Sequence, residues 1–268
     1  MSTERAECDT VAFEVAEGIA WVSFNRPEKR NCMSPSLNRQ MMRVLDELEF
    51  REDVGVLVLT GEGTSWTAGM DLKEYFRETE ARGVGATRKA QREAYGWWRR
   101  LRWYQKPTIA MIDGFCIGGG LGIALSSDMR IAAEGSTFGI PAAKLGLAYG
   151  ATGTGRLVNV VGPSFAKEIF FTARRFTHDE AHSMGLVNRV TTKEALENFV
   201  RDYCALIAEN APMTVNTAKQ VVDEFAKAPG NFDAEKCDTL IARCFASDDY
   251  KEGRAAFMEK RKPAFKGK

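Results

Sequence analysis

Three consecutive glycines stand in the stretch DGFCIGGGLGIALSSD, residues 113–128, between a short apolar segment and a helical pattern. The stretch continues from PTIAMIDG, residues 107–114, an apolar run that predicts a strand buried on both faces. Glycines at a strand–helix junction let the backbone approach a ligand closely, with N–H groups and the positive end of the helix dipole aimed at it. Three glycines also permit tight packing of a helix on a sheet, so the motif alone leaves both interpretations open.

Apolar runs and helical patterns alternate on both sides of this stretch. The predicted strands are two around an EG turn in 11–24, one at 54–61 and a weaker one at 129–140. The predicted helices are 34–52, 86–105 and 119–128. Ser34 followed by Pro35 is a suitable N-cap and first-turn proline for the first of these helices. The alternation predicts an α/β core with right-handed crossovers.

After about residue 160 the pattern becomes a series of amphipathic helices with few strands between them. We therefore expect an α/β core over residues 1–195 and a helical C-terminal region over residues 196–268.

Composition narrows the class of partner. The 37 basic and 36 acidic residues nearly cancel, so no overall basic field indicates a nucleic-acid partner. The first dozen residues lack the basic and apolar regions of a secretory signal, and no apolar run reaches the length of a membrane span. We therefore expect a cytoplasmic protein with neither a nucleic-acid nor a membrane partner.

Cysteines and histidines give little support for a metal site. The six cysteines are scattered without a CxxC pair. The two histidines, His178 and His182, stand four residues apart in a predicted helix, a spacing that can place two ligands on one face. No HExxH pattern surrounds them, so a solvated helix face is favoured and we expect no bound metal.

A second glycine turn, TSWTAGMDLKEYF at 64–76, follows the strand predicted at 54–61. With NRPEKRN at 25–31 before it, and the triple glycine and FGIPAAKLGL after it, the order of motifs resembles the enoyl-CoA hydratase (crotonase) superfamily. Weaker signatures, MGLVNRV at 184–190 and FMEKRKPAF at 257–265, extend the resemblance to most of the chain.

The resemblance implies a crotonase-like core of repeated ββα units with a helical C-terminal region, assembled as a homotrimer or a homohexamer. It implies a coenzyme A thioester as substrate and no permanently bound cofactor. The AGMDL turn and the middle glycine of GGG match the two main-chain N–H donors of the family's oxyanion hole, here Met70 and Gly119. Two such donors hold the thioester carbonyl oxygen while it gains charge in an enolate-like state.

The resemblance also implies where coenzyme A binds. Lys29 and Arg30 are candidate contacts of its phosphates or ribose, and the backbone around Ala68 is a candidate contact of its adenine. Phe257 and Lys260, in the C-terminal region, match positions that reach the nucleotide, in some members from a neighbouring subunit. Further candidates for binding the substrate or its coenzyme are Asp71, Leu72, Tyr75 and Gly118. The alternative for the charged and aromatic side chains among these is a solvated charge or a core aromatic.

Hydration of an enoyl thioester in this family uses two glutamates, which hold the water and transfer protons. The position two residues after GGG carries Gly122, and the position after the proline of FGIP carries Ala142. The usual hydratase mechanism therefore cannot simply be transferred to this chain.

Up to about residue 120 the chain most resembles the hydroxycinnamoyl-CoA (feruloyl-CoA) hydratase-lyases, in NRPEKRNCMSPSLNR, WTAGMDLKEYFRE and KPTIAMIDG. In those enzymes a tyrosine of the EYFRE stretch binds the phenol, and Tyr75 matches it, but their remaining carboxylate would fall at Ala142. The segment GGGLGIALSSDM resembles the 4-chlorobenzoyl-CoA dehalogenases. Their nucleophilic aspartate would fall near Tyr149 and Gly150, and no aspartate stands there, which excludes that chemistry.

Four polar residues are the nearest in sequence that could replace the glutamates: Tyr149, Tyr75, Glu74 and Asp113. Glu74 is better explained as a solvent-facing helix residue. Tyr149 lies in LAYGATGTG, a loop that borders the acyl pocket in the family, and is our candidate catalytic side chain or polar acyl contact. A set of aromatic residues could line a site for a bulky or aromatic acyl group, although packing in the core explains their presence equally well. The set is Trp66, Tyr75, Trp97, Trp98 and Trp103.

The sequence thus predicts an acyl-CoA-processing enzyme, a hydratase/isomerase-like lyase that stabilises a thioester enolate. The alternatives are a catalytically impaired acyl-CoA-binding protein, and a hydroxycinnamoyl-CoA hydratase-lyase-like enzyme with a relocated acid/base. Nucleotide-dependent redox chemistry, suggested by the glycines at 150–155, is rejected because PAAKLGLAY before them is a poor strand.

Overall fold

The computed structural model describes residues 4–74, 96–227 and 230–268. The chain divides into two compact units, Met1–Tyr104 with Thr108–Val200, and Gln105–Pro107 with Arg201–Lys268. The division falls inside helix α7 (Leu196–Ala208).

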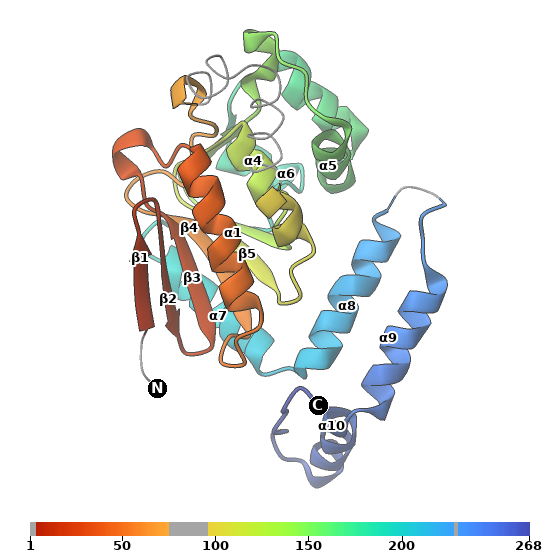
Figure 1. Cartoon of the computed structure of the whole chain (residues 1–268). Helices are drawn as coiled ribbons and strands as arrows, with labels where there is room; N and C mark the ends of the chain where they lie inside the picture. Colours follow the sequence, from red (N-terminus) through yellow and green to blue (C-terminus); the bar gives the residue numbers. More distant parts are fainter. Residues whose placement is uncertain (1–3, 75–95, 228–229) are drawn as a thin grey trace. The chain divides into compact units, whose positions relative to one another are not determined.

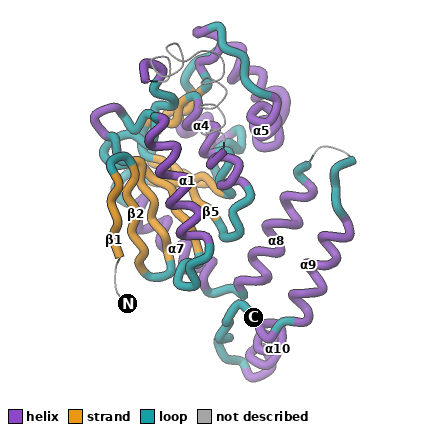
Figure 2. The backbone as a smooth tube through the Cα atoms, viewed as in Figure 1, coloured by secondary structure: helices purple, strands orange, loops and turns teal. Residues whose placement is uncertain are grey.

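A seven-stranded sheet forms the centre of the first unit (Figure 1). In spatial order its strands are β1 Glu4–Cys8, β2 Val11–Ala16, β3 Ile19–Phe24, β4 Val56–Gly61, β5 Thr108–Ile112, β7 Met129–Ala133 and β10 Arg189–Thr191. β1, β2 and β3 pair antiparallel, whereas the neighbours from β3 to β10 pair parallel. Parallel neighbours need crossover connections, and Figure 2 shows helices following the strands, so the predicted α/β class is confirmed.

The apolar runs form strands as predicted. All six residues of β3 are buried, as are the first four of β4. The EG turn joins β2 to β3, and both turn residues have positive φ, 54° at Glu17 and 79° at Gly18. Such a turn matches the right-handed twist of a hairpin, so local sequence fixes this pairing.

Helix α1 (Pro35–Glu49) covers one face of the sheet (Figure 1). Ser34 is its N-cap, and the Ser34 hydroxyl accepts a hydrogen bond from the Leu37 N–H at 3.1 Å. Leu37, Met41 and Leu45 recur at helical spacing and are fully buried in the core. The predicted cap and helix are confirmed.

The single weak strand predicted at 129–140 is wrong. β7 ends at Ala133, and β8 (Thr137–Gly139) belongs to a separate small sheet with β6 (Phe115–Ile117) and β9 (Phe176–Thr177). The chain turns at Gly135, whose φ of 80° is incompatible with a continuous strand.

The helix predicted at 119–128 is shorter than expected. Helix α4 spans Gly119–Ala124, and the Ser126 hydroxyl donates to the Gly122 carbonyl oxygen at 2.9 Å. A serine that bonds to the backbone in this way competes with the helix's own hydrogen bonds, which explains the early end.

Further helical elements lie mostly after residue 140, earlier than the change to helices predicted at about residue 160. They are η1 Pro27–Lys29, η2 Pro141–Leu145, α5 Ala151–Thr172, α6 His178–Ser183, α8 Pro212–Phe225, α9 Ala234–Ala246 and α10 Asp248–Glu259. Helix α5 is interrupted at Gly162 (φ 74°), immediately before Pro163. In the parts of the chain that the structure describes, no helix is both long and apolar enough to cross a membrane.

Candidate active site

Main-chain hydrogen bonds fix Met33, two residues after the NRPEKRN motif, against the AGMDL turn. The Met33 N–H donates to the Gly69 carbonyl oxygen at 2.8 Å, and the Asp71 N–H donates to the Met33 carbonyl oxygen at 2.9 Å. Met33 and Met70 therefore form a parallel bridge.

On its other side the AGMDL turn pairs with β6, the strand that leads into the triple glycine. The Thr67 N–H donates to the Phe115 carbonyl oxygen at 2.8 Å, and the Ile117 N–H donates to the Thr67 carbonyl oxygen at 3.2 Å. The two glycine motifs, far apart in sequence, therefore meet at one junction.

The N–H groups of Met70 and Gly119 both lie at this junction. Met33 bonds to Gly69 and Asp71, the two residues on either side of Met70, and not to Met70 itself. The Met70 N–H therefore points away from Met33, toward the side where Thr67 meets β6. Gly119 is the first residue of α4, where N–H groups have no partner within the helix. In the described part of the chain, neither N–H donates to an acceptor.

Close packing favours glycine at positions 69 and 119, against main-chain atoms at position 69 and against side chains at position 119. Gly69 has a φ of +100°, and a Cβ there would lie 2.6 Å from the Ile117 carbonyl oxygen and 3.4 Å from the Gly119 nitrogen. A Cβ on Gly119 would lie 2.7 Å from Met33 Cε and 3.1 Å from Trp98 Cη2. The segments that carry the two N–H groups are therefore packed directly against each other.

Asn31 ties the NRPEKRN motif to the loop before the AGMDL turn. Its Oδ1 accepts from the Arg26 N–H at 2.8 Å, and its Nδ2 donates to the carbonyl oxygens of Ser65 at 2.6 Å and Glu62 at 2.8 Å. Asn31 is fully buried, so these bonds are shielded from water.

A buried guanidinium of the NRPEKRN motif joins it through charge to the AGMDL turn and to the residue two positions after it. Arg26 is 7% exposed, donates from Nη1 to the Cys32 carbonyl oxygen at 2.8 Å, and pairs through Nη2 with Glu74 at 2.7 Å and Asp71 at 3.4 Å. Burial alone raises the pKa of Asp71, but the Glu74 N–H and the charges of Lys29 and Arg26 together hold that pKa below its usual value. Glu74 is held by cations, and its side chain is 30% exposed.

The residues proposed to contact coenzyme A from the first unit lie around this network. Lys29 is exposed, and its Nζ lies 2.5 Å from Glu74 Oε1, which raises the pKa of Lys29. Arg30 is exposed, with its guanidinium carbon 5.3 Å from the centre of the Phe115 ring, and its carbonyl oxygen accepts from the Ala68 N–H at 3.0 Å. Leu72 is half-buried at the start of the helical residues 72–74.

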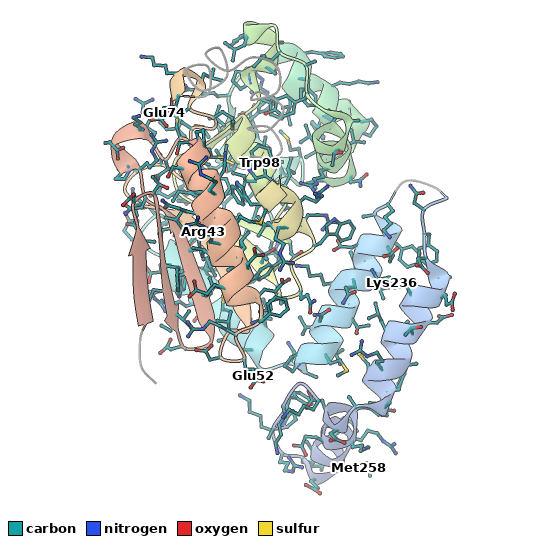
Figure 3. The ribbon with its side chains drawn as sticks, viewed as in Figure 1. Arg43, Glu52, Glu74, Trp98, Lys236 and Met258 are labelled. Atoms are coloured by element: carbon teal, nitrogen blue, oxygen red, sulfur yellow. The ribbon has the colours of Figure 1, made fainter. Side chains whose placement is uncertain are left out.

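The two positions that would carry the family's glutamates are closely packed. A Cβ on Gly122 would lie 3.2 Å from Trp98 Cζ3, and Figure 3 marks Trp98 beside α4. Ala142 is 6% exposed, and its carbonyl oxygen accepts from the Leu147 N–H at 3.0 Å. Neither position offers a proton-transfer group.

Of the four candidate replacements, Tyr149 lies beside the triple glycine. Its hydroxyl oxygen would lie 3.9 Å from a Cβ on Gly118, and its ring packs edge-on against Phe170 with 5.5 Å between ring centres. Asp113 pairs instead with Lys193 at 2.8 Å. Glu74 belongs to the network around Arg26. Tyr75 lies outside the described residues.

Gly118 holds the turn that places Gly119. Its φ of 57° and ψ of −119° are available to glycine but strained for other residues, and its N–H donates to the Gly139 carbonyl oxygen at 2.8 Å. Phe257 and Lys260 belong to the second unit, where Phe257 is 82% exposed and Lys260 ends α10 with a φ of 55°.

Two other motifs from the sequence have structural explanations. His178 Nδ1 accepts from the Gly135 N–H at 3.1 Å, and among the described residues no group of three or more metal-ligating side chains is placed to hold an ion. The glycines at 150–155 follow the 3₁₀ helix η2 and a loop rather than a strand.

Sequence reasoning did not distinguish Trp98 from the other tryptophans. Trp66 and Trp97 pack edge-on against Phe24 in the core, and Trp103 is 48% exposed. The sequence feature that could have indicated a side chain packed on this helix is Gly122, because a glycine inside a helix leaves space that a neighbouring side chain can fill.

The chain matches the enoyl-CoA hydratase/isomerase family over residues 14–268. It is 42% identical over 220 residues to a hydroxycinnamoyl-CoA hydratase-lyase of Pseudomonas fluorescens, covering 82% of this chain and 80% of that protein. It is 35% identical over 259 residues to a short-chain-enoyl-CoA hydratase of Clostridium acetobutylicum, covering 96% and 97% of the two chains.

Solved structures agree with these sequence relatives. An enoyl-CoA hydratase/carnithine racemase from Magnetospirillum magneticum superposes with a TM-score of 0.91 at 28% identity, covering 98% of this chain and 97% of that one. An enoyl-CoA hydratase from Geobacillus kaustophilus superposes with a TM-score of 0.92 at 26% identity over the full length of both chains. The chain therefore belongs to the enoyl-CoA hydratase/isomerase, or crotonase, family.

Proposed function

We propose that this chain binds a coenzyme A thioester and polarises its carbonyl group with the N–H groups of Met70 and Gly119. The observation that supports the proposal is the junction of the two glycine turns, where a Cβ on Gly69 would lie 3.4 Å from the Gly119 nitrogen and Met70 is the next residue. Donors fixed in this way stabilise an oxygen as it becomes an enolate oxyanion. Removing one such donor costs about 3–4 kcal/mol of transition-state stabilisation in comparable sites.

We expect an acyl-CoA enzyme of hydratase/isomerase type in which hydration is slow. Gly122 and Ala142 offer no carboxylate to hold and deprotonate water, and Trp98 lies in contact range of Gly122. Tyr149 is our candidate for the polar group that faces the acyl chain, supported by the position of its hydroxyl near Gly118.

A second candidate is a hydroxycinnamoyl-CoA hydratase-lyase-like enzyme with a relocated acid/base, supported by the 42% identity to a relative of that activity. The third is an acyl-CoA-binding protein that has lost turnover. Turnover of an acyl-CoA separates the first two candidates from the third.

The coenzyme is expected along the first unit's network, at Lys29, Arg30 and the backbone of Ala68. Phe257 and Lys260 are candidates by resemblance alone, from positions that in some members reach the nucleotide of a neighbouring subunit. We expect no permanently bound cofactor. We also expect a homotrimer or homohexamer, which analytical ultracentrifugation tests directly, since the particle must have three or six times the mass of the chain.

Carbonyl polarisation is tested by infrared difference spectra of crotonyl-CoA labelled with carbon-13 at the thioester carbonyl. We expect the bound carbonyl to absorb at lower frequency than the free one, because hydrogen bonds weaken the C=O bond. Gly119→Ala should reduce this shift, since its Cβ would meet Met33 and Trp98 and displace the donor. Gly155→Ala is the matched control, because a Cβ there meets nothing within 4 Å. An unchanged shift in Gly119→Ala would contradict the proposal.

Turnover is tested with a panel of aliphatic and aromatic acyl-CoAs, assayed alongside calorimetric binding. We expect measurable thioester binding with slow or absent hydration of crotonyl-CoA, and reduced turnover of the preferred substrate in Tyr149→Ala. Rapid crotonyl-CoA hydration would show that other residues supply the protons. Unchanged turnover in Tyr149→Ala would remove Tyr149 from the site, and binding of no acyl-CoA would exclude all three candidates.

A further inference from the structure

The Trp98 indole lies along a face of α4 that carries no side chains. Gly119 and Gly122 are three residues apart and share this face. The outer edge of the indole follows it, with Cη2 3.1 Å from the Cβ position of Gly119 and Cζ3 3.2 Å from that of Gly122. Trp98 is 8% exposed, so the ring is a nearly buried part of the structure beside Gly119.

The neighbouring tryptophan fixes the orientation of this ring. Trp97 Nε1–H donates to Asn38 Oδ1 of α1 at 2.8 Å, and its ring packs against Phe24 at 6.2 Å between ring centres. Trp97 and Trp98 belong to the helical segment of residues 96–102, the described part of the helix predicted at 86–105. Successive helix residues point about 100° apart, so anchoring Trp97 in the core directs Trp98 toward α4. The two indoles stand 87° to each other with centres 6.3 Å apart.

We propose that Trp98 determines acyl specificity by forming the wall of the acyl site next to the Gly119 N–H. The inference rests on the proposed function, because it takes that N–H as a donor to the thioester carbonyl. The indole touches the residue that holds the carbonyl, so the first acyl carbons come within reach of its edge. The site therefore accepts acyl groups that are flat and unbranched next to the thioester, such as enoyl and aryl-enoyl groups, and excludes those branched at the α-carbon.

The same contact accounts for glycine at position 122. A side chain there would enter the space of the indole edge, since even a Cβ would lie 3.2 Å from Cζ3. Trp98 and Gly122 are thus a matched pair, in which the aromatic ring occupies room that a longer residue at 122 needs. A glutamate introduced at 122 alone is therefore not expected to restore hydration.

The test compares dissociation constants of crotonyl-CoA, which is flat, and pivaloyl-CoA, which is branched at the α-carbon. We expect wild type to bind crotonyl-CoA about tenfold or more tightly than pivaloyl-CoA, the size of effect that forced overpacking produces. Trp98→Ala should bring the two constants close together, with affinity for free coenzyme A unchanged. The matched control is Trp103→Ala, which removes a half-exposed tryptophan just beyond the same helical segment and should keep the wild-type ratio.

A purely structural role for Trp98 would lower stability without changing this ratio, so urea unfolding is measured on every variant. If Trp98→Ala does not fold, Trp98→Phe replaces it, because phenylalanine keeps an aromatic residue in the core. For Trp98→Phe we expect a ratio of the two dissociation constants between the wild-type ratio and one. A folded Trp98 variant that keeps the wild-type ratio of the two dissociation constants overturns the specificity role of Trp98 and leaves the proposed function intact. Failure of wild type to bind either thioester overturns the proposed function as well.

The pairing of Trp98 with Gly122 is tested by a double-variant comparison. Gly122→Ala should weaken crotonyl-CoA binding in the wild-type background and have little effect in the Trp98→Ala background. Equal effects in both backgrounds would contradict the pairing.

Discussion

Asn31 holds three main-chain groups with one amide. Its Oδ1 accepts from Arg26, and its Nδ2 donates to the carbonyl oxygens of Glu62 and Ser65. Its φ of 54° is left-handed, a conformation in which asparagine is enriched among the non-glycine residues. An asparagine here therefore stabilises both the turn of its own motif and the loop that approaches the AGMDL turn.

Asn31→Ala should lower the free energy of unfolding by about 2–4 kcal/mol, because three main-chain groups lose their partner in a buried site. Urea unfolding followed by circular dichroism measures the change. Asn210→Ala, at an exposed asparagine, is the control and should change stability by less than about 0.5 kcal/mol. Equal losses in the two variants would show that the Asn31 bonds do not contribute as described.

At the scale of elements, the start of α1 depends on one hydroxyl. Ser34 is 2% exposed and accepts from the Leu37 N–H, while Pro35 occupies a first-turn position that needs no N–H donor. The helix begins just after Met33, so its first turn also fixes the residue that bridges Met70. A weaker cap should therefore loosen the AGMDL turn as well as the helix.

Ser34→Ala should reduce the free energy of unfolding by about 1 kcal/mol, the usual loss when a helix N-cap is removed. Ser36→Ala is the control, because among the described residues the Ser36 hydroxyl caps no main-chain N–H and accepts only from Gln40 Nε2, at 3.3 Å, so its loss should cost less. Chemical unfolding of both variants distinguishes the cap from a general effect of serine replacement. The prediction fails if the two variants have the same midpoint.

The pH response of the whole molecule includes a carboxylate in the second unit. Glu224 on α8 is fully buried as a side chain and pairs with Lys227 and with Lys236 of α9, the latter at 2.8 Å. The hydrogen bonds from Lys227 and Lys236 lower the pKa of Glu224 to about 2. A carboxylate with a depressed pKa stabilises the folded state above its unfolded pKa, and this stabilisation is lost as pH falls toward the folded value.

Wild type should therefore lose stability more steeply than Glu224→Gln as pH falls from about 5 toward 2, because glutamine cannot titrate. At neutral pH the glutamine variant should be the less stable of the two. Urea midpoints measured across this range test both statements. Parallel pH profiles for the two proteins would show that Glu224 is not the group responsible.

The sequence by itself determined the features that depend on neighbouring residues. The EG turn between two short strands fixed the β2–β3 hairpin, Ser34 and Pro35 fixed the start of α1, and apolar runs marked the buried strands. The order of short motifs predicted the family, and the two glycine turns marked the main-chain donors that we propose at Met70 and Gly119. Turns, caps and periodicity are local, and the sequence therefore displays them directly.

Only the tertiary structure decided how these pieces meet. The bridges from Met33 to Met70 and from Thr67 to Cys116 are main-chain hydrogen bonds, which carry no signature in the side chains. The division of 129–140 between two sheets depends on partners far away in sequence. The contact of Trp98 with Gly119 and Gly122 joins two helical segments, and no local pattern in either one specifies the other. Contacts between distant segments are set by packing of the whole core, which is why the Trp98 wall emerged only from the fold.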